Sequence, residues 1–212
     1  MDMLRQAYQR FGVYTVGATW WGVESLTSKR PIRKPEDFKG VKHRGAQGIA
    51  SETIAKMGAS IVVLPGGEAY SALEKGIVDS VDWSTISVNS KVGFFEVAKY
   101  ATFPGFHSMP IQDFTVNANA WKALPDDVKQ IVDRTWREFS QTQVSRIAEN
   151  DKRVAEEVKK KGVELVVWSD ADLARARQIA QGVVDEWAAK GALAKQSAES
   201  QRAFLRELKL LA

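Results

Sequence analysis

The stretch that decides the fold is LPGGEAYSALEKGIVDSVDW, which runs from Leu64 to Trp83. It predicts a tight turn at residues 65–67, a short helix that ends at Gly76, and then a short strand. An acidic residue and a large aromatic residue, Asp82 and Trp83, stand side by side where that strand is expected to end. Ligands of open α/β sheets bind in the crevice outside strand ends. Taken alone, the stretch therefore predicts a loop, a helix and a strand, with Asp82 and Trp83 at a strand end where a carboxylate beside an indole can hold a cation or a polar group.

Short strands and short helices alternate on either side of this stretch. We expect helices over residues 1–10, 51–57 and 91–100, and strands over residues 13–19, 41–44, 61–64 and 115–117. The continuous apolar run at 61–64 is typical of a buried parallel strand. This order predicts a parallel or mixed sheet flanked by helices.

The last third of the chain has a different character. Pro125, followed by two acidic residues, predicts the start of a long helix over about 126–161. A strand over 163–168 and a helix that Ser169 caps and that ends near Gly191 follow. A last amphipathic helix is expected over about 194–211.

Composition excludes several kinds of chemistry. The 212 residues include no cysteine and only two histidines, His43 and His107. Disulfides, thiol catalysis and cysteine-ligated metals are therefore excluded. No apolar run is long enough to span a membrane. The start, MDMLRQAYQRFG, lacks the features of a signal peptide, so we expect a cytoplasmic chain, a processed form or a fragment.

The net charge of +4 comes largely from one cluster of cations between Lys29 and Arg44. A nucleic-acid site is not favoured, because no aromatic residues interleave with these cations to stack on bases. A solvated loop and helix edge is the preferred interpretation, and a basic cleft that attracts small anions fits equally well.

The order of several short motifs resembles the extracytoplasmic solute-binding proteins of TRAP transporters, the DctP-like family. The motifs are Pro31-Ile32, residues 35–42, Arg44, residues 58–60, residues 65–83, residues 96–100, and the series Asn117, Trp121, Leu124 and Pro125. Each motif is short, but their order and spacing together are specific. Asp82-Trp83 and the run Pro104 to His107 resemble a branch that includes receptors for 2-oxo acids and lactate.

The resemblance implies a periplasmic-binding-protein-like two-lobe fold with βα lobes and a long C-terminal helix. Members of the family carry a signal peptide and a further N-terminal portion, and this sequence begins after that portion, so we expect an incomplete first lobe. Residues 1–21 and 109–147 would be its remnant plus the long helix. Residues 22–108 and 148–212 would be the second, ligand-binding lobe with the C-terminal helices.

The resemblance also implies a function without catalysis. The protein would be a periplasmic receptor whose lobes close on a small organic carboxylate and deliver it to the membrane permease of a TRAP transporter. An incomplete first lobe would leave an apolar face uncovered, and we therefore expect either a homodimer or a refolding of residues 1–21 across the gap.

The ligand site implied by the resemblance consists of Arg44, Gln47, Asp82, Trp83, Phe106 and His107. The planar fork of Arg44 can hold a carboxylate through two hydrogen bonds. In the related branch an acidic–tryptophan pair ligates a cation, which would place a sodium or calcium ion at Asp82 and Trp83. Ser108 stands where that branch often has an acid, so we expect a weak cation effect or none.

Two alternatives stay open. One is a small α/β hydrolase-like enzyme, although the G-x-S-x-G motif is absent and histidines are few. The other is a truncated structural or interaction domain that binds no ligand. Hydrolysis of esters would favour the enzyme, and a ligand-dependent rise in melting temperature would favour the receptor.

Overall fold

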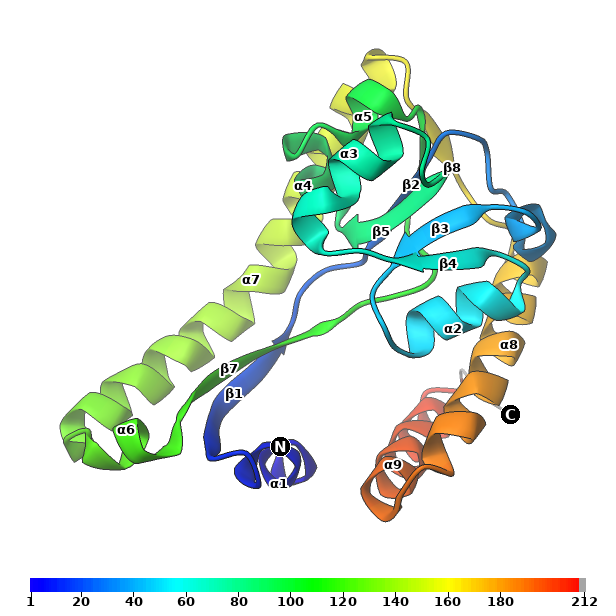
Figure 1. Cartoon of the computed structure of the whole chain (residues 1–212). Coiled ribbons are helices and arrows are strands. Elements are labelled where there is room, and N and C mark those ends of the chain that lie inside the picture. The colour runs from blue at the N-terminus through cyan, green and yellow to red at the C-terminus, as the bar shows by residue number, and fades with distance from the viewer. Residues whose placement is uncertain (210–212) are drawn as a thin grey trace. The chain divides into compact units, whose positions relative to one another are not determined.

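The computed structural model describes residues 1–209 (Figure 1). The strands are β1 (Val13–Trp20), β2 (Ser25–Ser28), β3 (Lys42–Gly45), β4 (Ser60–Val63), β5 (Ser80–Ser84), β6 (Tyr100–Thr102), β7 (Ile111–Asn117) and β8 (Glu164–Val166). The α-helices are α1 (Asp2–Gln9), α2 (Ile49–Lys56), α3 (Ala69–Glu74), α4 (Ile86–Lys91), α5 (Phe94–Val97), α6 (Ala118–Ala123), α7 (Asp126–Lys160), α8 (Asp170–Ala188) and α9 (Ala192–Glu207). Two 3₁₀ helices, η1 (Pro35–Phe38) and η2 (Gly66–Glu68), complete the list. Within this range no helix is both long and apolar enough to cross a bilayer.

The chain forms two compact units. Unit 1 comprises residues 1–21, residues 110–147 and the chain from Asp185 onward, and unit 2 comprises residues 22–109 and 148–184. These boundaries lie within one residue of the expected lobe boundaries near 21, 109 and 147. The difference is the chain from Asp185 onward, which contains the end of α8 and all of α9 and which the sequence grouped with the second lobe. Arg202 on α9 pairs with Asp185 at 2.7 Å, and α9 also contacts α1, so the contacts of α9 are with unit 1.

Unit 2 is built on a mixed sheet with the strand order β4-β3-β5-β2-β6-β8. Strand β3 runs parallel to β4 and β5, β6 runs parallel to β8, and β2 is antiparallel to both of its neighbours. The predicted α/β class and mixed sheet are thus confirmed. The sequence does not predict β2, because Ser-Leu-Thr-Ser has no apolar run, yet all four residues are buried.

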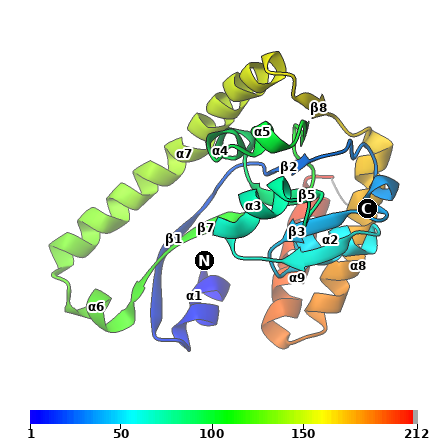
Figure 2. The ribbon, with the colours of Figure 1, turned by 45° about the horizontal axis from the view of Figure 1, so that its top comes forward.

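Helices cover both faces of this sheet (Figure 2). Helices α2 and α8 pack on one face, in a cluster that includes Ile54, Phe38 and Ala176. Helices α3 and α5 pack on the other face, in a cluster that includes Leu73 and Phe94. On β4, Ile61 packs against the first cluster and its neighbour Val62 against the second, as the pleat of a β-strand requires.

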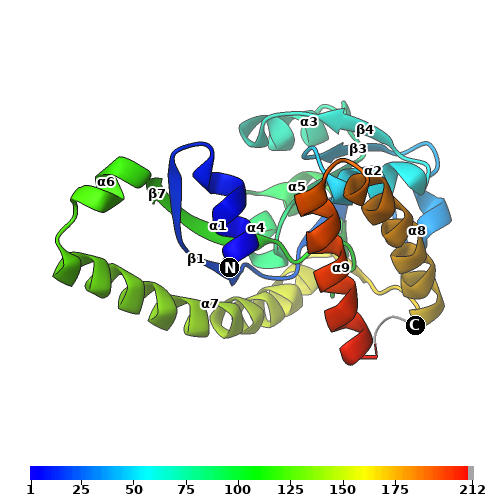
Figure 3. The same ribbon diagram turned by 90° about the horizontal axis from the view of Figure 1, so that it is seen from below.

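Unit 1 contains the antiparallel pair of β1 and β7, with α1 packed beside β1 (Figure 3). A β-bulge interrupts the pair between Thr15 and Gly17. A Cβ atom at Gly17 would lie 2.0 Å from the indole nitrogen of Trp136 on α7, so only glycine lets this helix approach the strand so closely. The side chain of Asn117 caps α6 by accepting hydrogen bonds from Asn119 N and Ala120 N.

The elements differ from the prediction mainly between residues 86 and 102. A single helix over 91–100 was expected, and this prediction is wrong. Gly93 adopts a φ of +86°, which ends α4, and the chain then forms the four-residue α5 and enters β6 at Tyr100. The long helix starting at Asp126 is confirmed, and Ser169 caps α8 through Asp172 N. The predicted end of the last helix at 210–211 lies outside the described residues.

Several cations of the cluster between Lys29 and Arg44 make hydrogen bonds within the protein. Lys29 and Lys42 donate through Nζ to the carbonyls of Glu74 and Gly76, at 3.2 and 2.9 Å. These carbonyls lie at the C-terminal end of α3, where a helix favours positive charge. The two lysines therefore hold α3 against the sheet, a role that the preferred interpretation of a solvated loop and helix edge did not include.

Candidate ligand-binding site

The candidate site lies at one edge of the unit 2 sheet. Arg44 is near the end of β3, Leu64 follows β4, and Asp82 and Trp83 lie in β5. The segment 103–109 follows β6. Because these four strands are mutually parallel, their carboxyl ends meet at one edge, and ligands of α/β sheets bind outside such an edge. The topology therefore brings the predicted residues together although they are far apart in sequence.

Arg44 is held across this edge by backbone carbonyls. Its Nε and Nη2 donate to the carbonyl of Leu64 at 3.3 and 3.0 Å, and its Nη1 donates to the carbonyl of Asp82. A guanidinium carries five N–H donors, and these bonds use three of them. One N–H on each terminal nitrogen remains without a partner among the described residues. These two donors form the fork that a carboxylate can accept.

The indole of Trp83 supports the guanidinium. The Cζ atom of Arg44 lies 5.3 Å from the Trp83 ring centroid, within the range of a cation–π contact. The indole in turn lies against the turn at Gly66, where a Cβ atom would come within 2.3 Å of Trp83 Cζ3. Phe94 packs edge-on against the same ring, with the centroids 6.1 Å apart. The Pro-Gly-Gly turn therefore fixes Trp83, and Trp83 limits where the Arg44 fork can point.

A cluster of titratable groups lies beside this arginine. His107 Nε2 is 3.1 Å from Asp82 Oδ1 and 3.9 Å from Glu24 Oε2. The side chains of the three residues are each at most 13% exposed. The loop that carries His107 approaches Glu24 closely, since a Cβ atom at Gly105 would lie 1.7 Å from the Glu24 carbonyl oxygen. Glycine at 105 is thus what allows the loop to place His107 between the two carboxylates.

The cluster favours a charged His107. Burial opposes the imidazolium, but the hydrogen bond to Asp82 and the charges of Asp82 and Glu24 outweigh it and raise the pKa of His107. Burial alone would raise the pKa of Asp82, yet the contact with His107, together with His43 and Arg44, lowers it. Burial, followed by the charge of Asp82, raises the pKa of Glu24. An imidazolium and an Asp82 carboxylate therefore form the stable pair.

A metal ion fits this cluster poorly. One ligand-type atom from each of Glu24, Asp82 and His107 lies within 4.8 Å of the others. Calcium takes six to eight oxygen ligands, and magnesium also prefers oxygen. Two carboxylates and an imidazole provide few such ligands, and a protonated imidazole already supplies the positive charge. These three side chains alone therefore supply fewer oxygen ligands than calcium takes.

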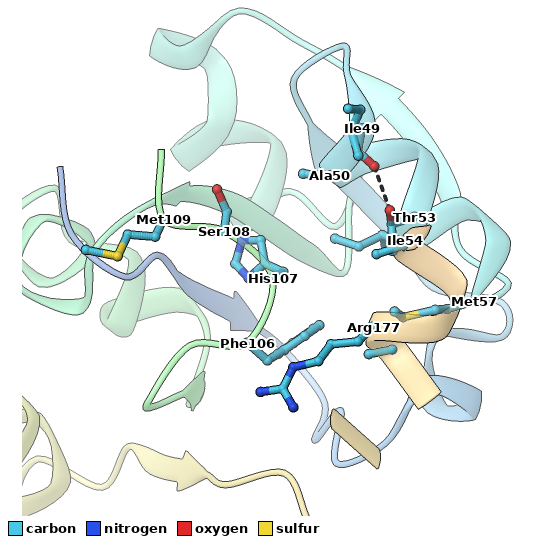
Figure 4. A pocket seen from close by; sticks show the side chains of 12 residues that line it. Ile49, Ala50, Thr53, Ile54, Met57, Phe106, His107, Ser108, Met109 and Arg177 are labelled. Carbon is cyan, nitrogen blue, oxygen red and sulfur yellow. Dashed lines mark hydrogen bonds between the residues drawn. The ribbon is translucent and has the colours of Figure 1, made fainter. Parts of the chain in front are cut away.

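Of the two remaining predicted site residues, Phe106 lies beside His107 and Gln47 does not join the hydrogen-bonded cluster. Gln47 is exposed in the loop after β3, apart from the hydrogen-bonded cluster. Phe106 stacks on Trp168 with centroids 3.9 Å apart and lines a pocket next to His107 (Figure 4). Sequence reasoning missed Glu24, because a lone acid before an unpredicted strand carries no pattern. Only its neighbourhood in space reveals it.

The other histidine, His43, belongs to the core. Its Nδ1 lies 2.8 Å from the hydroxyl oxygen of Ser80, and both residues are fully buried. Burial lowers the pKa of His43 to about 3, so the ring is neutral. A serine and a histidine in contact suggest a hydrolase, but a substrate cannot reach a pair with no exposed surface. This pair therefore gives no support to the enzyme alternative.

An arginine fork at the carboxyl edge of an α/β sheet defines a protein suited to holding small anions. Residues 1–190 match the family model of the bacterial extracellular solute-binding proteins, family 7 (DctP), and the chain belongs to this family. The expected resemblance is thereby confirmed.

Three similar proteins illustrate the match. A monocarboxylate 2-oxoacid-binding periplasmic protein of Nostoc sp. is 29% identical over 97% of this chain and 57% of its own length. A TRAP periplasmic solute-binding protein of Rhodobacter sphaeroides, solved in an apo open form, is 30% identical, with a TM-score of 0.79, over 100% of this chain and 67% of its own. One of Desulfovibrio salexigens with bound orotic acid is 25% identical, with a TM-score of 0.85, over 97% of this chain and 65% of its own. The chain spans just over half the length of the first of these, the Nostoc relative.

Proposed function

We propose that this protein is the solute receptor of a TRAP transporter and captures a small organic carboxylate. The observation that carries the proposal is the Arg44 fork, with one N–H left on each terminal nitrogen at the edge of the sheet. Arg44 is only 8% exposed, so little solvent competes for these donors. Charge-assisted, bidentate hydrogen bonds in such a place are the strong ones.

The relatives support the class of solute. The Nostoc relative is named for monocarboxylate 2-oxo acids, and the Desulfovibrio relative was solved with orotic acid, also a carboxylic acid. We infer that this receptor acts in the periplasm, hands its solute to the membrane permease of the transporter, and performs no catalytic step. His107, held between Asp82 and Glu24, offsets negative charge beside the arginine, so that these carboxylates repel an anionic solute less.

Calorimetry with pyruvate as the probe tests this proposal. We expect the wild-type chain to bind pyruvate and Arg44→Lys to bind it 10- to 150-fold more weakly, because a lysine keeps the charge but cannot form the planar fork. That range corresponds to about 1.5–3 kcal/mol for a hydrogen bond to a charged group.

The control is pyruvamide, which has the same shape without the charge and should not bind. Circular dichroism shows whether the Arg44→Lys variant keeps its fold. Equal affinity of a folded Arg44→Lys variant for pyruvate would refute the role of the fork.

A cation at Asp82 and Trp83 is a weaker proposal. The charged pair of Asp82 and His107 occupies the carboxylate that would serve as the principal ligand. We therefore propose that solute binding needs no added sodium or calcium, and we expect the cation effect to be small.

A further inference from the structure

A pocket of about 310 Å³ opens in unit 2, between α2, the loop at 106–109 and α8 (Figure 4). An apolar cavity of about 150 Å³ holds a benzene molecule, so this pocket has room for an aromatic ring with a short chain. Apolar side chains make up most of its lining, among them Ile54, Met57 and Phe106. Arg44 does not line it, so the pocket is separate from the candidate carboxylate site.

The walls of this pocket are fixed by the core of unit 2. Ile54 and Met57 belong to the buried cluster under α2. The ring of Phe106 stacks on Trp168 with the centroids 3.9 Å apart, and Trp168 Nε1 donates to the carbonyl of Ile32 at 2.8 Å. A ligand therefore meets side chains that are already ordered, and binding does not have to immobilise them.

Most polar side chains around the pocket are already paired. The hydroxyl of Thr53 donates to a carbonyl of its own helix at 2.7 Å, and the side chain of Ser108 hydrogen-bonds to the Glu24 carboxylate. Nε2 of His107 is paired with Asp82, and its Nδ1 is buried, so this ring offers a ligand only its carbon atoms. These three side chains therefore add little that could anchor a polar group.

Arg177 is the lining side chain whose polar group is open to a ligand. It is exposed, and its guanidinium has no partner among the described residues. Arg175 on the same helix differs, because it pairs with Asp172 and Glu36. A guanidinium only donates hydrogen bonds, and no acidic residue lines the pocket. The charge of the lining therefore favours a ligand with an anionic group.

We propose that this pocket binds a small amphipathic anion, a molecule with an aromatic or branched apolar body and one anionic group such as a carboxylate. The apolar body lies against Ile54, Met57 and Phe106, and the anionic group lies at the rim on Arg177. This ligand is distinct from the transported solute, because it does not touch Arg44. The inference therefore stands or falls independently of the proposed receptor function.

Mapping of backbone amide shifts by NMR, with 4-phenylbutanoate as the probe, tests this proposal. We expect a dissociation constant on the order of 1 mM, as is typical of a ligand with about twelve non-hydrogen atoms. The largest shifts should fall on α2, the loop at 106–109 and α8. The alcohol 4-phenyl-1-butanol has the same body without the charge. It should bind about two- to fivefold more weakly, which is the range for an exposed ion pair.

Two pairs of variants locate the two parts of the ligand. Ala180 lines the pocket and is half-buried, so Ala180→Phe should weaken binding of the acid more than tenfold, whereas Ala174→Phe, on the exposed side of the same helix, should not. Arg177→Gln should remove the preference for the acid over the alcohol. Arg175→Gln removes the same charge from the same helix but not from the lining, so it should keep that preference. Circular dichroism shows whether each variant is folded.

Arg44→Lys separates this pocket from the carboxylate site. The acid should bind that variant with wild-type affinity, and a loss of affinity there would assign the acid to the carboxylate site and overturn the proposal. In the wild-type chain, shifts centred away from the pocket walls, or no shift at ten times the expected dissociation constant, would overturn it without any variant. Undiminished binding to a folded Ala180→Phe variant, or an acid preference that survives Arg177→Gln, would overturn it as well.

Discussion

Replacing Gly66 by alanine should disturb the site through Trp83. The added Cβ atom would lie 2.3 Å from Cζ3 and 2.4 Å from Cη2 of the Trp83 indole. Carbon atoms in favourable contact are about 3.5–4.0 Å apart, so the ring or the turn must move by more than ~1 Å. The same ring supports the Arg44 guanidinium, whose Cζ is 5.3 Å from its centroid. The strain therefore reaches the carboxylate fork directly.

The neighbouring Gly67 provides a matched control. A Cβ atom at Gly67 meets nothing within 4 Å. Both alanine variants reduce the entropy of the unfolded chain by a similar amount, a gain of about 0.4–1 kcal/mol that cancels in the comparison. What remains is the overpacking at Gly66, which typically costs about 1–3 kcal/mol. For a chain of this size, each kcal/mol shifts the melting temperature by about 2–4 °C.

Thermal melts and pyruvate calorimetry on both variants make the comparison. We expect Gly66→Ala to have a lower melting temperature than Gly67→Ala, by the amount that the overpacking energy predicts. Gly66→Ala should also bind pyruvate more weakly than the wild-type chain, whereas Gly67→Ala should keep the wild-type affinity. If the two variants share the same melting temperature and the same affinity, the turn does not position Trp83 and the reasoning is wrong.

Three further measurements test other parts of the molecule. The pKa of His43 is about 3 in the folded state and near 6.5 in the unfolded state. The stability that the neutral ring contributes is therefore fully present above pH 6.5 and is lost as the pH falls from 6.5 to about 3. The contribution of His43 to the slope of the free energy of unfolding against pH is at most about 1.4 kcal/mol per pH unit. In urea unfolding, the free energy of His43→Gln should depend on pH less steeply than that of the wild-type chain by that amount. Identical slopes for the two proteins would contradict the buried neutral ring. Thermal melts with EDTA, sodium or calcium should nearly coincide, and a large calcium-specific rise that Asp82→Asn abolishes would show that the cluster does bind metal. Phe11, Ile111 and Ile131 of unit 1 are each at least half exposed, so light scattering should show self-association that grows with concentration, and the mass of one chain at every concentration would exclude it.

The strand-end residues of the site could be predicted because their position follows from the sheet. Arg44, Asp82 and Trp83 each stand near the end of a short strand, and parallel strands bring such ends together. The pairing of His107 with Asp82 could not be derived in this way. It depends on a loop whose path is set by the contact of Gly105 with the Glu24 backbone, and no local pattern encodes that contact.

The same distinction applies to the fold. The long helix from Asp126 has a clear start signal and was predicted nearly to its last residue. Strand β2 has no signal of its own, because it is polar in sequence and becomes a strand only through its two neighbours. The break at Gly93 was missed since a single glycine within a helical pattern is often tolerated.

The place of β2 has a consequence for how unit 2 folds. Thr27 pairs with Val81 and with Ala101, which are 54 and 74 residues further along the chain (81 − 27 and 101 − 27). The middle of the sheet thus closes two long loops before it gains its pairing, and domains dominated by such distant contacts fold slowly. Until residue 101 is present, β2 lacks one of its neighbours and exposes an unpaired edge that can join another chain. A chain still being synthesised would spend that interval open, which is the state that a chaperone recognises and in which aggregation begins.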